Sequence, residues 1–76
     1  MATMTFKQYI ATRRSSDTAA GDFTEDALRD PDLPDATSWD ELRRYVERKA
    51  GLPVRDAVVA AAHEVWEGYE QALSKV

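Results

Sequence analysis

The stretch RDPDLPDATSWDEL, residues 29 to 42, combines two prolines, a helix-start signal and a tryptophan. Pro31 disfavours helical backbone at the residue before it and is expected to end a helix there, while Pro34 keeps the chain extended. Ser38 then provides an N-cap, and Glu41 three residues later is expected to complete a capping box. We therefore predict that this stretch is a stiff joint between two helices.

Upstream of this joint, the spacing of apolar residues predicts two helices. The first is expected from about Thr5 to Arg14, with Thr5 and Gln8 as a capping box. The second is expected to start near Ala19, because acids in a first turn suit the positive end of a helix dipole. The residues that repeat at helical spacing are Phe6, Tyr9, Ile10 and Arg13 in the first helix, and Ala20, Phe23, Ala27 and Leu28 in the second.

Downstream of the joint, two more helices are expected. The one that begins after Ser38 should end near Gly51, where a left-handed glycine cap would fall, and the last should run from about Pro53 to Ser74. Gly68 inside that helix predicts close approach of another backbone, for which the first helix is our candidate. The expected core faces are Trp39, Leu42, Tyr45 and Val46, then Val54, Val58, Ala61, Ala62, Val65, Trp66, Tyr69 and Leu73.

The pattern as a whole is all-α, a compact bundle of four or five helices in a single domain over residues 4–75. A chain of 76 residues allows one domain at most, and it has no cysteine and one histidine. Its longest apolar run, residues 57–62, is too short to cross a membrane, and no positive segment precedes an apolar one at the N-terminus. We therefore expect a soluble cytoplasmic protein with no membrane partner.

Four segments resemble a known family: MTFKQYIATRR at 4–14, DALRDPDLP at 26–34, TSWDELRRYVE at 37–47 and VWEGYEQAL at 65–73. They are similar to the YozE-like family of small bacterial proteins, whose fold resembles the sterile alpha motif (SAM). The resemblance covers nearly the whole chain and implies a SAM-like bundle. Because the family is essentially uncharacterised, it implies a binding module only by analogy of fold.

Charge is divided unevenly along the chain. Residues 17 to 41 include nine acidic residues and one arginine, whereas basic residues outnumber acidic ones between residues 42 and 55. We call Asp30, Asp32 and Asp35 the acidic face, and Arg43, Arg44, Arg48, Lys49 and Arg55 the basic face. We expect a protein-protein adaptor that uses both faces, with a second copy, bound head to tail, as one candidate partner.

Two other interpretations of these charges remain open. Arg43, Arg44 and Arg48 would face the phosphates of a nucleic acid, although the net charge of −4 disfavours a polyanion. Alternatively, Arg44 is satisfied by Asp40 or Glu41 on its own solvated helix.

Metal and catalytic roles are not expected. The acidic face offers oxygen ligands, but its turn lacks the glycine and distal glutamate of an EF-hand loop, so we expect no metal or other cofactor. His63 has no nucleophile or partner carboxylate fixed near it in the sequence, which argues against an enzyme and a small-molecule substrate. Trp39, Trp66 and Tyr69 are expected to pack in the core.

Overall fold

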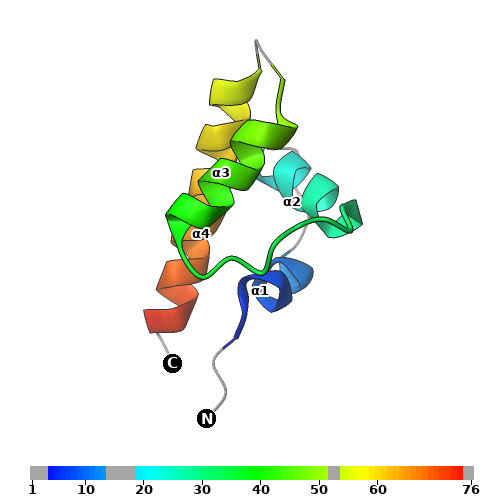
Figure 1. The fold of residues 1–76 in the computed structure, drawn as a ribbon. Helices are drawn as coiled ribbons and strands as arrows, with labels where there is room; N and C mark the ends of the chain where they lie inside the picture. Colours follow the sequence, from blue (N-terminus) through cyan, green and yellow to red (C-terminus); the bar gives the residue numbers. More distant parts are fainter. Residues whose placement is uncertain (1–3, 14–18, 52–53, 75–76) are drawn as a thin grey trace.

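The computed structural model describes residues 4–13, 19–51 and 54–74, and these ranges hold four helices and no strand. The helices are α1 (Phe6–Thr12), α2 (Ala19–Arg29), α3 (Trp39–Lys49) and α4 (Arg55–Ser74). The longest, α4, supports the others: α2 and α3 pack along it, and α1 lies against α2 and α4 (Figure 1). The predicted all-α bundle is confirmed, whereas the domain bounds 4–75 stay a prediction.

The start of α1 has the predicted capping box. The Gln8 amide donates to Thr5 Oγ1 at 3.2 Å, and the Thr5 amide donates to Gln8 Oε1 at 3.0 Å. The helix ends at Thr12, because Arg13 has extended backbone angles. Arg14, the expected last residue of this helix, lies outside the described residues.

The joint between α2 and α3 forms where the prolines predict it. Helix α2 begins at Ala19, as expected, and ends at Arg29, two residues before Pro31. Ser38 is the N-cap of α3, and its Oγ accepts from the Glu41 amide at 3.2 Å. The return half of the predicted capping box is wrong, because the Glu41 carboxylate accepts from the Thr37 amide at 3.3 Å instead.

The expected left-handed cap at Gly51 is wrong. Helix α3 ends at Lys49, and Ala50 has extended angles with its amide donating to Val46 at 2.8 Å. Gly51 is not in the left-handed region. The extended backbone leads toward α4, where Arg55 Nε donates to the Ala50 carbonyl at 3.5 Å. Pro53, expected in the first turn of α4, lies outside the described residues.

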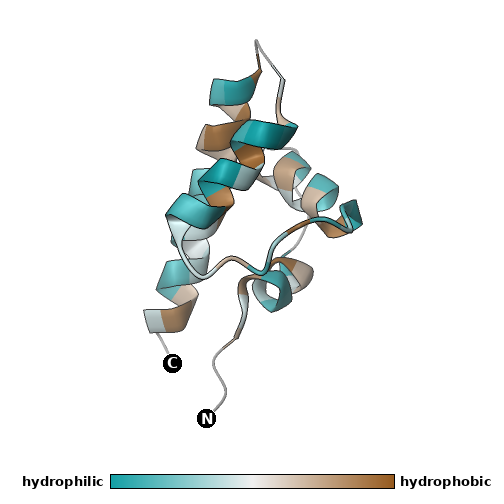
Figure 2. Ribbon diagram, viewed as in Figure 1, coloured by the Kyte–Doolittle hydropathy of each residue, from teal (hydrophilic) through white to brown (hydrophobic). Residues whose placement is uncertain are grey.

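The core lies where the inner faces of all four helices meet. Hydrophobic positions turn inward along α3 and α4, and the outer side of α3 is hydrophilic (Figure 2). Rings of Phe6, Trp66 and Tyr69 pack with centroids 5.0 to 5.6 Å apart, which ties α1 to α4. The buried hydrophobic residues are Phe6, Ile10, Ala20, Phe23, Ala27, Leu33, Ala36, Leu42, Tyr45, Val46, Ala61, Ala62, Val65, Trp66 and Tyr69.

Three predicted core positions differ from this pattern. Leu28 is 49% exposed because it follows buried Ala27 and so lies about 100° further round α2, on its outer side. Val54 is 54% exposed because it precedes α4 rather than lying on its inner face. Trp39 is half-buried: it packs against the core and its ring lies 4.8 Å from that of His63.

The first helix is the neighbour of Gly68, as predicted, but the atoms that approach this glycine belong to side chains and not to another backbone, so that part of the prediction is wrong. A Cβ atom at position 68 would meet Tyr9 Oη and would lie 3.2 Å from Arg13 Nη1. Arg13 Nη1 itself donates to Tyr9 Oη at 2.9 Å. The glycine therefore leaves room for this pair of side chains.

Candidate functional site

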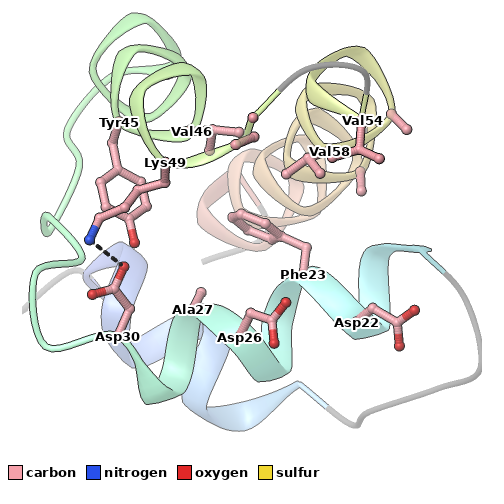
Figure 3. Close-up of a pocket in the computed structure, with 14 residues that line it drawn as sticks. Asp22, Phe23, Asp26, Ala27, Asp30, Tyr45, Val46, Lys49, Val54 and Val58 are labelled. Atoms are coloured by element: carbon pink, nitrogen blue, oxygen red, sulfur yellow. Dashed lines mark ion pairs between the residues drawn. The ribbon is translucent and has the colours of Figure 1, made fainter.

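A groove of about 470 Å³ runs between α2, α3 and the N-terminal half of α4. It exists because α2 and α3 each pack on α4 but, in the described part of the chain, not on one another. Figure 3 shows Phe23 pointing into the space between α2 and α4, with Val46 and Val58 opposite. Its lining is mainly apolar, with charged residues at the edge, whereas a second hollow on the outer side of α3 is lined by polar and charged residues alone.

The floor of the groove is apolar. Phe23, Val46 and Ala61 contribute buried side chains from three different helices. Val58 is partly buried, and Val54 stands exposed at one end. Because exposed apolar surface costs free energy in water, covering these valines would be favourable.

The α2 edge of the groove is acidic. Asp22, Asp26 and Asp30 line it at intervals of four residues, which puts them on one side of α2 and of the turn that follows it. Within the described ranges, Asp22 and Asp26 make no ion pair. We call these three residues the carboxylate row.

Lys49 of α3 reaches the Asp30 end of this row. Its Nζ is 3.6 Å from Asp30 Oδ2, the ion pair drawn in Figure 3, and 3.4 Å from Asp32 Oδ2. The contact joins the end of α3 to the end of α2. It also joins the predicted basic face to the predicted acidic face within one molecule.

The acidic face is therefore divided rather than continuous. Asp30 Oδ1 also accepts from the Asp32 amide at 2.9 Å, so these two residues shape the turn and hold Lys49. Asp35 faces elsewhere, since its Oδ1 accepts from the Lys7 amide in the first turn of α1 at 3.1 Å. No group of three His, Cys, Asp or Glu side chains is placed to hold a metal ion within the described ranges.

Asp35 also influences Tyr69. Burial of the Tyr69 hydroxyl, and secondarily the negative charge of Asp35, raise the pKa of Tyr69 above its ordinary value. The hydroxyl donates to the Met4 carbonyl at 2.9 Å, a bond that only the protonated phenol makes.

The basic face is also partly satisfied within the chain. Arg44 pairs with Asp40 at 3.1 Å, as one of the helix-pair alternatives predicts, and Arg43 pairs with Glu47 at 3.5 Å. Glu41 is not the partner of Arg44, because it bonds the Thr37 amide. Arg55 is committed to the Ala50 carbonyl at 3.5 Å.

Arg48 alone among the basic-face residues has neither an ion pair nor a hydrogen bond to another described residue. It lies exposed on the outer side of α3. Arg48 nevertheless lies one turn from Arg44, with which it lines a hollow on the surface of α3.

His63 has a partner that sequence reasoning missed. Its Nδ1 lies 2.9 Å from Glu67 Oε1, one turn further along α4. Both side chains are about half exposed, at 49% and 57%. The expectation that no carboxylate lies near His63 is wrong, and the spacing of four residues was the signal that would have found it.

Sequence reasoning also missed the groove. The four-residue spacing of the carboxylate row was visible, but its proximity to the valines of α4 was not.

No helix in the described ranges has the length and apolar character needed to cross a membrane.

Comparison with curated proteins and with solved structures gave no match. The family model described as YozE SAM-like fold matches residues 5–71, a span that includes all of α1, α2 and α3 and most of α4. The same span contains the proline joint, the capped tryptophan helix and the groove. This chain therefore belongs to the YozE SAM-like family.

Proposed function

We propose that this domain is a non-catalytic protein-binding module and that the groove between α2, α3 and α4 is its contact site. The observation that carries the proposal is a mainly apolar groove whose α4 side leaves Val54 and Ala57 exposed and Val58 only partly buried. At its edge stand the carboxylates of Asp22 and Asp26, which make no ion pair within the described ranges. Protein contacts characteristically combine a desolvated apolar centre with a polar, solvent-accessible rim.

The arrangement suits a macromolecule better than a small substrate. Small-molecule sites usually enclose their ligand and aim a few polar groups into it. Here the carboxylates of Asp22 and Asp26 stand at the edge, on exposed residues, and the interior surface is apolar.

The predicted contact through the acidic and basic faces has less support. Lys49 already pairs with Asp30 and Asp32 in its own molecule, so a head-to-tail contact between copies would have to replace these ion pairs. A nucleic-acid role has less support still, because Arg43 and Arg44 form ion pairs with acidic residues of their own helix. A cytoplasmic location remains our proposal from the sequence.

The test compares two equal substitutions on one helix. Ala57 and Ala60 are both exposed on α4, but only Ala57 lines the groove. Wild-type protein, Ala57→Glu and Ala60→Glu are immobilised and used to capture proteins from a bacterial extract, and each captured protein is then purified and titrated directly. Circular dichroism verifies that the variants are folded.

We expect at least one partner that binds wild-type protein and Ala60→Glu with equal affinity. The same partner should bind Ala57→Glu at least about tenfold more weakly, because the contact would bury an unpaired carboxylate. Equal binding by all three proteins would show that the groove is not the contact site.

A further inference from the structure

We propose that the occupant of the groove is a basic amphipathic helix, with apolar side chains on the floor and lysine or arginine against Asp22 and Asp26 of the carboxylate row. This inference rests on the proposed function and names the chemistry of the partner.

The floor suits a helix because its apolar side chains come from three directions. Phe23 of α2, Val46 of α3 and Val58 of α4 point toward the space between the three helices (Figure 3). Amphipathic helices bind such grooves through side chains at positions i, i+3 or i+4, and i+7. Exposed Val54 extends the apolar surface at one end of the groove.

The charges at the edge of the groove indicate that the contacting surface of the partner is positively charged. Asp22 and Asp26 are exposed, one helical turn apart and without ion pairs in the described ranges. Lys49, the cation among the described lining residues, is held by Asp30 and Asp32 and so does not offset them. An edge of this kind attracts cations and repels an acidic helix.

The spacing of the carboxylate row adds a geometric requirement. Residues four apart lie on one side of a helix, about 6 Å apart along its axis. A partner helix lying along α2 would meet Asp22 and Asp26 with basic residues that are also about one turn apart. The match is therefore to a periodic basic pattern and not to net positive charge alone.

A second copy of this chain fits the groove less well. Its exposed arginines on α3, Arg43, Arg44 and Arg48, have no exposed apolar residue among them, because Leu42, Tyr45 and Val46 are buried in the core. Such a surface supplies the charge but not the apolar anchors. A foreign helix that has both is the better complement.

The test uses a labelled synthetic peptide of about 18 residues, or five helical turns, with leucine along one face and lysine beside it. A scrambled peptide of the same composition controls for charge alone, and a version with glutamate in place of lysine controls for sign. Binding to the full 76-residue chain is measured by fluorescence anisotropy. The first variant is Ala57→Glu, with Ala60→Glu as its control. The second is the double variant Asp22→Asn/Asp26→Asn. Its control is Glu25→Gln, because Glu25 is exposed on α2 but does not line the groove.

We expect the amphipathic basic peptide to bind at least about tenfold more tightly than either control peptide. Ala57→Glu should abolish this preference, and the double asparagine variant should weaken binding about fivefold, as expected for two exposed charge contacts. Ala60→Glu and Glu25→Gln should bind as the wild type does. Raising the salt concentration should weaken binding of the wild type more than of the double variant.

Equal binding of the basic and scrambled peptides, or no effect of the double variant, would overturn the inference. If the peptide fails while a captured protein still depends on Ala57, only the basic chemistry is wrong and the binding module stands. If both fail, both proposals are wrong. Self-association in sedimentation velocity that Ala57→Glu abolishes would make a second copy the occupant and would also overturn the inference.

Discussion

Gly68 of α4 faces the phenol of Tyr9 so closely that a Cβ atom at position 68 would overlap the Tyr9 hydroxyl. This hydroxyl is held by Arg13 Nη1 at 2.9 Å, and the Arg13 guanidinium lies 5.7 Å from the centre of the Tyr9 ring. A side chain at position 68 would therefore disturb two residues of α1 and of the chain directly after it.

The first prediction concerns Gly68→Ala. Alanine should favour the helix by about 1 kcal/mol, but the displaced hydroxyl and its lost bond should outweigh this gain and lower the free energy of unfolding by about 1 kcal/mol in the wild type. In a Tyr9→Phe background the same change should be stabilising. Urea denaturation of the four proteins measures the cycle; an effect of the same sign in both backgrounds would contradict it.

The second prediction concerns pH and Tyr69. Because the pKa of Tyr69 is raised in the folded protein, first by burial and then by Asp35, folding favours the neutral phenol. This contribution is fully present below the unfolded pKa of about 10 and is lost as the pH rises through the folded pKa. The free energy of unfolding should therefore fall in alkaline solution.

Tyr69→Phe supplies the control for that decline. Near neutral pH it should cost about 1 kcal/mol, because the bond to Met4 is lost. Above pH 10 the difference between wild type and variant should shrink, since only the wild type loses stability by ionising Tyr69. Urea denaturation from pH 8 to 11 measures this; a constant difference would count against the assignment.

The third prediction concerns the cap of α3. Ser38→Ala should lower the free energy of unfolding by about 1 kcal/mol, because the Glu41 amide loses its acceptor. Ser74→Ala is the matched control: its hydroxyl donates to the Gln71 carbonyl at the exposed end of α4 and caps no amide. Thermal or urea denaturation of both variants should show a clear loss only for Ser38→Ala.

The fourth prediction separates the members of the acidic face. Asp35→Ala should cost about 1 kcal/mol, because it removes the acceptor of the Lys7 amide, while Asp35→Asn keeps an acceptor and should cost less. Asp32→Ala should change the free energy of unfolding by less than about 0.5 kcal/mol, since its ion pair with Lys49 is exposed. Equal losses at both positions would contradict the division of this face.

Local features of the fold were predictable because short stretches determine them. The joint after Arg29, the Thr5 and Ser38 caps and the buried face of α1 follow from side chains that act within a few residues. The left-handed cap at Gly51 was predicted wrongly: Ala50 has extended angles instead, and its carbonyl accepts from Arg55 at the start of α4. That contact comes from another helix and was not visible in the residues that end α3.

The candidate site was less predictable for a similar reason. A run of charges in the sequence suggested two continuous faces, yet Lys49 joins them and Asp35 is used by α1. The groove depends on the separation of α2 from α3, and periodicity within each helix carries no information on that distance. The four-residue spacing of the carboxylate row was visible in the sequence, but its position beside the groove could be known only from the packing of the helices.

The bond from Tyr69 to Met4 spans 65 residues of sequence. Helix α1 is the shortest of the four and packs less extensively than α2 or α3 does on α4. Its attachment to α4 closes most of the chain into a loop. The loss of chain entropy on closure opposes docking, and the ring contacts of Phe6, Trp66 and Tyr69 offset it only once α1 is in place. Helix α1 should therefore dock last during folding, after α2, α3 and α4 have formed the walls of the groove. In the folded protein its amide hydrogens should exchange with solvent before those of the other three helices.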